Sequence, residues 1–77
     1  MAQIMDSDID ILEQWILERE HFTVKMITDF MGKKRIGGSS YFQKARECKN
    51  QVIEPLIAVK KIKRVKNGQY DRCDGND

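Results

Sequence analysis

Histidine and cysteine, the side chains that most often ligate zinc or serve in nucleophilic catalysis, are few in this sequence. The 77 residues include one histidine, His21, and two cysteines, Cys48 and Cys73. A structural zinc site normally takes four Cys or His ligands, so the chain could complete one only by sharing it with a second chain. The sequence also lacks a paired nucleophile and base, a Walker-type glycine loop and an HExxH motif. We therefore expect a protein that is not an enzyme and that uses no metal, cofactor or small-molecule substrate.

The sequence instead offers a concentration of cations that can bind an anionic partner. Residues 33–66 contain eleven Lys and Arg residues against two Glu, which gives a net charge of +9. Residues 1–32 carry a net charge of −5 and residues 67–77 carry −2, so the whole chain has a formal charge of only +2. A folded protein with this distribution is polarised, and its dipole orients it toward a polyanion.

Length and composition indicate one small folded domain. Hydrophobic residues make up 40% and charged residues 34% of the chain, which is enough apolar material for a modest core. We expect residues 1–73 to form this domain and residues 74–77 to be a disordered acidic tail. No apolar run approaches the roughly 20 residues of a membrane-spanning helix, and the acidic first ten residues do not resemble a signal peptide. These features predict a cytoplasmic protein without a membrane partner.

Apolar residues at helical spacing predict a first helix over about residues 8–20. Ser7 is suited to be its N-cap, and the acidic residues that follow favour the positive end of a helix. Trp15 is expected to lie in the core. His21 interrupts the helical pattern, so we expect it to mark the end of this helix.

A second, short helix is predicted over about residues 24–31. Thr23 is its expected N-cap. Gly32 follows the last apolar position, where a helix commonly needs a residue in the left-handed conformation. The stretch 33–38 is basic, contains glycine and has no periodicity, so we expect a loop there.

The third predicted helix spans about residues 39–53 and begins at Ser39 or Ser40 as N-cap. Proline in a helix interior costs about 3 kcal/mol, so we expect this helix to end near residue 53 and Pro55 to begin a separate turn or short helix. The apolar positions of the third helix follow a spacing of three and four residues and are Phe42, Ala45, Cys48 or Lys49, and Val52.

The last predicted element is a basic β-hairpin over residues 61–73. Its strands, 61–66 and 69–73, flank Asn67 and Gly68. Asn-Gly is favoured at the two central positions of a type I′ turn, both of which require positive φ.

Three helices followed by a hairpin is the order of the winged helix-turn-helix domain, and the sequence resembles that family in three segments. Residues 23–32 resemble its positioning helix, residues 39–46 resemble the capped start of its recognition helix, and residues 56–70 resemble the end of that helix and the wing. In size and order the chain is similar to small bacterial, phage and plasmid winged-helix regulators, with the PapI/FaeA-like group the nearest. Two features depart from the pattern, namely the long loop 33–38 and the interruption at Pro55.

This resemblance implies an α+β fold with a two-stranded wing and a function in sequence-specific binding of double-stranded DNA. The protein would be a transcriptional regulator or a phage or plasmid accessory factor, and it would act as a homodimer or with a partner protein because one small module buries too little DNA surface for high specificity. The loop before the third helix would contact the DNA backbone, the helix would enter the major groove, and the hairpin would contact the neighbouring backbone or minor groove. The implied DNA-binding residues are Lys33, Lys34, Arg35, Ser39, Ser40, Tyr41, Gln43, Lys44, Arg46, Lys63, Arg64 and Lys66.

Other interpretations of the same residues remain open. The basic runs are equally compatible with solvated surface, and the hairpin cations with protection of an edge strand. Tyr41 and Phe42 are expected to pack in the core or at the helix cap rather than to stack on bases, and Cys48 is expected to be buried. The alternative function is a protein-binding winged-helix adaptor or inhibitor that uses the acidic first helix or the basic face. A third is RNA or nonspecific nucleic-acid binding.

Overall fold

The first helix, α1, begins and ends earlier than its sequence pattern predicts. In the computed structural model, which describes residues 4–73, α1 spans Asp6–Leu17, and its N-cap is Met5, which makes no side-chain cap hydrogen bond. The prediction of Ser7 as N-cap is therefore wrong. Acidic side chains in the first turn remain favourable because they face the positive end of the helix dipole. Trp15 is buried, as predicted.

Helix α2 spans Val24–Lys34 and runs three residues further than predicted. Its N-cap is Thr23, as predicted, and the Thr23 Oγ1 accepts a hydrogen bond from the Met26 N–H at 3.2 Å. The C-terminal prediction is wrong, because Gly32 lies inside the helix and Arg35 takes the left-handed conformation with φ of 57°. The loop predicted over residues 33–38 therefore begins only after Lys34, at the end of α2.

The third helix is a continuous rod made of α3 (Tyr41–Cys48), a π-helical turn (Lys49–Ile53) and α4 (Glu54–Ala58). The predicted short helix at Pro55 is present as α4, but the predicted end near residue 53 is not a break, since the backbone stays helical across the junction. The Glu54 N–H donates to the carbonyl of Lys49, five residues earlier, as in a π-helix. Pro55 then lies in the first turn of α4, where its missing N–H needs no partner. The widened turn thus accommodates the proline without a break.

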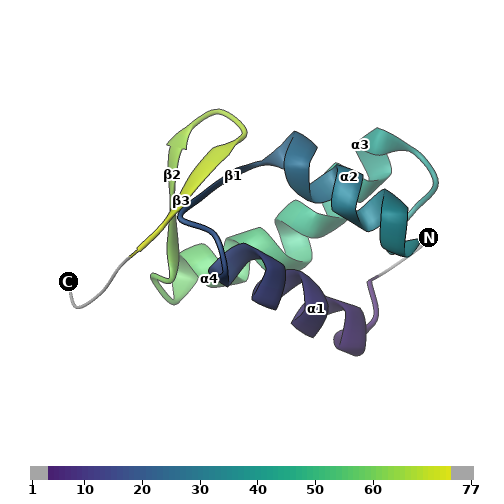
Figure 1. The fold of residues 1–77 in the computed structure, drawn as a ribbon, viewed down its shortest axis with the longest axis horizontal. Coiled ribbons are helices and arrows are strands. Elements are labelled where there is room, and N and C mark those ends of the chain that lie inside the picture. The colour runs from purple at the N-terminus through teal and green to yellow at the C-terminus, as the bar shows by residue number, and fades with distance from the viewer. Residues whose placement is uncertain (1–3, 74–77) are drawn as a thin grey trace.

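The sheet has three antiparallel strands in the order β1-β3-β2. Strands β2 (Ile62–Lys66) and β3 (Gln69–Arg72) form the predicted hairpin, and β1 (His21–Thr23) pairs with the other edge of β3. His21 therefore belongs to a strand rather than marking the end of a helix. The architecture is α+β with helices followed by a hairpin, and the sheet has one strand more than predicted (Figure 1).

The hairpin turn differs from the predicted type I′ turn. Gly68 has a φ of 76°, but Asn67 does not have a positive φ. The strand register shifts between Arg64 and Lys66. A single left-handed residue combined with such an irregularity is typical of hairpins that carry a bulge. The tip is also bound to α2, because the Val24 N–H donates to the Gly68 carbonyl at 2.9 Å.

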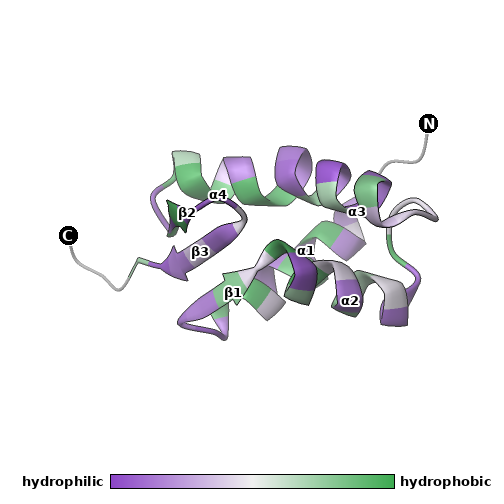
Figure 2. Cartoon of the chain, turned by 90° about the horizontal axis from the view of Figure 1, so that it is seen from above, coloured by the Kyte–Doolittle hydropathy of each residue, from purple (hydrophilic) through white to green (hydrophobic). Residues whose placement is uncertain are grey.

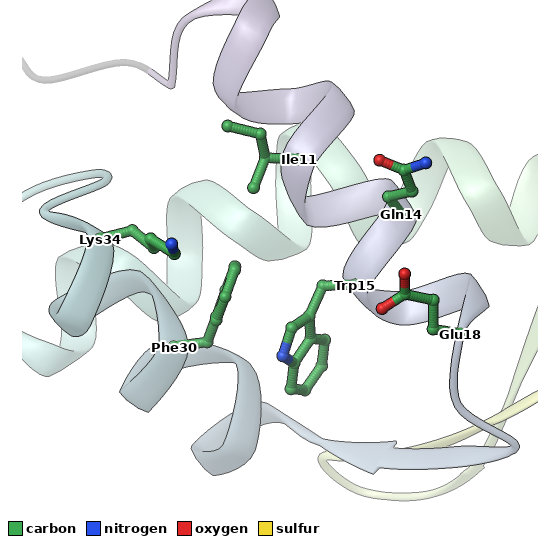
Figure 3. A pocket seen from close by; sticks show the side chains of 6 residues that line it. All are labelled: Ile11, Gln14, Trp15, Glu18, Phe30 and Lys34. Atoms are coloured by element: carbon green, nitrogen blue, oxygen red, sulfur yellow. The ribbon is translucent and has the colours of Figure 1, made fainter.

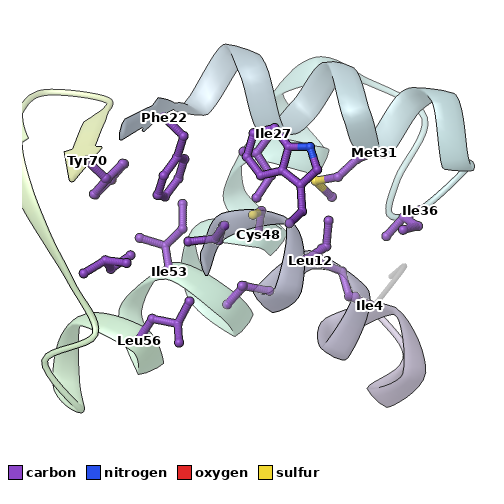
Figure 4. Packing of buried hydrophobic residues seen from close by; sticks show 14 residues of the cluster. Ile4, Leu12, Phe22, Ile27, Met31, Ile36, Cys48, Ile53, Leu56 and Tyr70 are labelled. Carbon is purple, nitrogen blue, oxygen red and sulfur yellow. The ribbon is translucent and has the colours of Figure 1, made fainter. Parts of the chain in front are cut away.

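The core lies where α1, α2, the third rod and the sheet meet (Figure 4). Aromatic rings connect the sheet to the helices, since Phe22 stacks on Tyr70 with ring centroids 5.3 Å apart and contacts the edge of Trp15 at 6.0 Å. Cys48 is completely buried, as predicted, and burial raises the pKa of its thiol to about 12. Burial is likewise the main cause that raises the pKa of the Tyr70 hydroxyl, and nearby Arg64 opposes it.

Candidate nucleic-acid interface

The start of α3 is held firmly by its cap and by the loop before it. Ser40 has extended backbone dihedrals, and its Oγ accepts a hydrogen bond from the Gln43 N–H at 3.1 Å. In the loop, the Ile36 side chain is buried, and Glu47 Oε1 accepts from the Gly38 N–H at 2.8 Å. The first turn of α3 is thus presented to solvent from a fixed position.

The exposed face of the third rod combines cations with an aromatic ring. Phe42, Arg46, Lys49 and Asn50 are all exposed, and their spacing of three and four residues makes them neighbours on one helix face. Phe42 is 80% exposed, so the prediction that it packs in the core or at the cap is wrong. Of these four residues only Arg46 was predicted to bind DNA. If Cys48 is taken as the buried residue of this helix, the helical spacing places Phe42, Lys49 and Asn50 on the opposite, exposed face.

The remaining predicted residues of this region differ in exposure. Tyr41 is 47% exposed and lies edge-on against Phe42, with ring centroids 5.5 Å apart and planes at 82°. It is therefore not a core residue. Gln43 and Lys44 are half-buried. Besides Arg46, the predicted residues of this region that are exposed are Ser39, Ser40 and Tyr41.

The cations predicted to form a loop lie partly in α2. Lys33 and Lys34 form the last turn of α2, followed by Arg35 at its C-cap, and all three are exposed. The amine of Lys34 lies 5.9 Å from the centroid of the Phe30 ring, on the side of α2 that faces α1. Lys34 therefore points away from the exposed face of α3.

The hairpin presents its predicted cations to solvent. Lys63, Arg64 and Lys66 are exposed on β2, and Val65 between them is 45% exposed. The register shift falls at this point, and a shallow depression lined by residues 64–67 lies beside it. The hydrogen bond between the hairpin tip and α2 keeps this edge in a fixed position relative to the helices.

The basic side chains between positions 33 and 66 form no ion pair with a carboxylate in the part of the chain that the structure describes. The close contacts between basic and acidic side chains among residues 4–73 are Arg19 with Glu18, at 4.0 Å, and His21 with Asp71, whose Nδ1 and Oδ1 are 2.6 Å apart. None of the eleven cations in the basic block therefore has a carboxylate neutralising it within those residues.

A groove between α1 and α2 forms a second surface feature (Figure 3). Trp15 and Phe30 form its floor, with ring centroids 5.5 Å apart in a stacked arrangement. The 43% exposed side chain of Ile11 lines the α1 side, and Glu18 and Lys34 add one charge of each sign. The groove is thus mainly apolar and lies on the acidic helix.

The predicted DNA-binding residues are brought together only in part. In Figure 1 the hairpin turn and the first turn of α3 lie on the upper side of the molecule, whereas α1 lies along the lower side. Seen from above in Figure 2, the third rod runs along one side and α2 along the other. The first turn of α3 and the hairpin turn therefore lie on another side of the molecule than α1, while the Lys34 amine lies over Phe30 in the groove between α1 and α2.

In comparisons with known protein families, curated proteins and solved structures, no match to this chain was found. None of the helices formed by the described residues is long and apolar enough to span a membrane. The same part of the chain contains no group of three or more His, Cys, Asp or Glu side chains arranged to hold a metal ion. The functional conclusion therefore rests on the geometry and charge of the surface.

Proposed function

We propose that this chain is a winged helix-turn-helix domain that binds double-stranded DNA sequence-specifically, with α3 in the major groove and the β2–β3 hairpin as the wing. The order of helices followed by a hairpin supports this fold. An α-helix with its side chains is about 10–12 Å wide, which matches the roughly 12 Å width of the major groove. The biological role would be that of a transcriptional regulator or a phage or plasmid accessory factor.

The observation that carries the proposal is the set of unpaired cations on α3 and the hairpin. Each basic side chain that neutralises a DNA phosphate releases counterions, and this release supplies much of the binding free energy. A cation already paired with a carboxylate would lose that partner on binding, whereas those between positions 33 and 66 have none among residues 4–73. The surface can therefore bind a polyanion without breaking an ion pair among residues 4–73.

The residue types on α3 suit base reading as well as phosphate binding. Arg46 can form two hydrogen bonds to guanine O6 and N7, and Gln43 can pair with adenine N6 and N7. Lys63, Arg64 and Lys66 on the hairpin would contact phosphates and set the orientation of the domain. A single module of this size buries about 600–1,000 Å² of surface on DNA, so we expect two copies on one site.

The experiment is a titration of the protein onto random and selected duplexes by fluorescence anisotropy at several salt concentrations. With about six phosphate contacts, the slope of log K against log salt should be about −5, and affinity should fall about 10³-fold between about 50 and 200 mM salt. The selected duplex should bind more tightly than the random one at every concentration. Weak binding without sequence preference would contradict the proposal.

The second candidate is a protein-binding adaptor, and the groove between α1 and α2 favours it. Ile11 leaves an apolar side chain exposed beside Trp15 and Phe30, as expected of a site that receives another protein. The two functions use opposite surfaces, so substitutions separate them. An adaptor would tolerate neutralisation of Arg46 and lose its partner on Ile11→Asp, whereas a DNA-binding domain would show the reverse.

A further inference from the structure

We propose that Phe42 is a specificity-determining residue that reads thymine through its C5-methyl group in the major groove. The inference rests on the proposed DNA-binding function and names the base that the exposed face of α3 recognises. The central observation is that a phenyl ring is 80% exposed on a helix face whose next exposed residues are Arg46 and Lys49.

The position of Phe42 gives it access to bases. It is the second residue of α3, in the turn fixed by the hydrogen bond from the Gln43 N–H to the Ser40 Oγ. A helix that enters the major groove brings its N-terminal residues closest to the base edges. Arg46 lies four residues later on the same face and would contact the adjacent base pair or phosphate. The cation and the ring thus face the same partner.

The orientation of the ring is restricted by its neighbour. Tyr41 packs edge-to-face against Phe42, with a centroid distance of 5.5 Å and an interplanar angle of 82°. The Phe42 ring therefore has an aromatic contact on one side and solvent on the other, which limits its freedom before binding. A preorganised apolar group loses less entropy on contact with a partner.

The chemistry selects thymine among the four bases. In the major groove the base edges of adenine, guanine and cytosine offer hydrogen-bonding groups to a reader, whereas thymine also offers an apolar methyl group. A phenyl ring has no hydrogen-bond donor to offer, so contact with the methyl is the interaction by which it discriminates. The minor groove, about 6 Å wide, is too narrow for α3 and contains no methyl group.

The test uses a duplex selected from a random pool by the full chain, and the same duplex with deoxyuridine in place of thymidine. Deoxyuridine keeps the base pairing and the hydrogen-bonding groups and removes only the methyl. The wild-type protein should bind the deoxyuridine duplex about fourfold more weakly per contacted methyl, the factor that corresponds to burial of one such group. Phe42→Ala should bind both duplexes equally.

A matched control is Val59→Ala, which removes exposed apolar surface at the other end of the rod, where Val59 is 62% exposed. This variant should discriminate between the two duplexes as the wild type does. Phe42→Ala should unfold at the same denaturant concentration as the wild type because the Phe42 side chain is 80% exposed and does not belong to the core. Any change in binding then reports the lost contact with DNA.

Several outcomes would overturn the inference. A selected site without a fixed thymine, equal binding of both duplexes by the wild type, or discrimination retained by Phe42→Ala would each do so while leaving DNA binding intact. Absence of preference for any duplex would instead overturn the proposed function as well. A dimer in sedimentation without DNA that Phe42→Ala dissociates, together with no effect of deoxyuridine, would assign the ring to a protein contact and also overturn the inference.

Discussion

Replacing Gly32 with alanine tests the boundary of α2 because sequence and structure predict opposite signs. In the structure Gly32 lies inside the helix, it does not have a positive φ, and a Cβ built on it meets no atom within 4 Å. Alanine is better than glycine in a helix interior by about 0.8–1.0 kcal/mol. Since Gly32 is close to the helix end, where fraying reduces such effects, we expect Gly32→Ala to raise the free energy of unfolding by about 0.5–1 kcal/mol.

The measurement is urea denaturation followed by circular dichroism at 222 nm, together with a thermal scan. For a chain of this size, 1 kcal/mol corresponds to a shift of about 4–8 °C in Tm. If Gly32 were the left-handed residue that ends the helix, alanine would instead lower stability, because that conformation costs about 1–2 kcal/mol for residues with a Cβ. A destabilised Gly32→Ala protein would therefore refute the assignment of Arg35 as the C-cap.

Two further variants test the expected direction of the stability change at residues with positive φ. Gly68→Ala places a Cβ at a φ of 76° with its nearest neighbour, Val24 Cγ2, at 3.9 Å, so the expected loss of about 1 kcal/mol arises from backbone strain rather than from a clash. Arg35→Gly relieves a φ of 57° and increases the entropy of the unfolded chain. These two effects oppose each other, and we expect a net gain of at most about 1 kcal/mol.

The remaining predictions concern the site and the core. Arg46→Ala should weaken the binding free energy for the selected duplex by about 1–3 kcal/mol and reduce sequence preference in anisotropy titrations. Lys34→Ala removes a charge from the α1–α2 groove and should leave the preference unchanged. Equal loss of preference in both variants would contradict these roles. Ser40→Ala should lower the free energy of unfolding by about 1 kcal/mol in urea denaturation because the Gln43 N–H loses its acceptor, and an unchanged midpoint would show that the cap is not needed. Burial raises the pKa of Cys48 to about 12, well above the roughly 8.5 of a free thiol, so between about pH 9 and 11 the unfolded state releases this proton and the folded state keeps it. As pH rises through this range, the free energy of unfolding of the wild type should fall by about 1.4 kcal/mol per pH unit more than that of Cys48→Ala. Identical slopes of unfolding free energy against pH would contradict the burial of a protonated thiol.

Local signals predicted two of the three N-caps and the hairpin correctly, whereas Ser7 is not the N-cap of α1 and Gly32 does not end α2. Thr23 and Ser40 act as N-caps because a hydroxyl next to a free backbone N–H is a short-range interaction that the sequence determines by itself. Asn67-Gly68 likewise located the hairpin turn. The turn type was missed because it depends on the register shift in β2, which is set by packing beyond the turn.

Strand β1 could not be predicted from its own three residues. The residue types of His21–Thr23 would fit a helix end or a loop as well as a strand. The hydrogen bonds of this strand go to β3, about fifty residues later in the chain. Phe22 pairs with Tyr70 in register and stacks on its ring. The strand therefore exists because the hairpin provides an edge and an aromatic surface, and both are long-range contributions.

The candidate site depends on helix phase, which the charge count along the chain does not contain. The three-and-four spacing of apolar positions in the third helix allows either Cys48 or Lys49 to face the core. These two side chains point about 100° apart on a helix. Burial of Cys48 selects the phase that turns Phe42 and Lys49 outward together. The same reasoning separates Lys34 from its neighbours, because its position in α2 directs its amine over Phe30. The charge count along the chain thus locates the basic segment, whereas core packing decides which of its side chains are exposed to a partner.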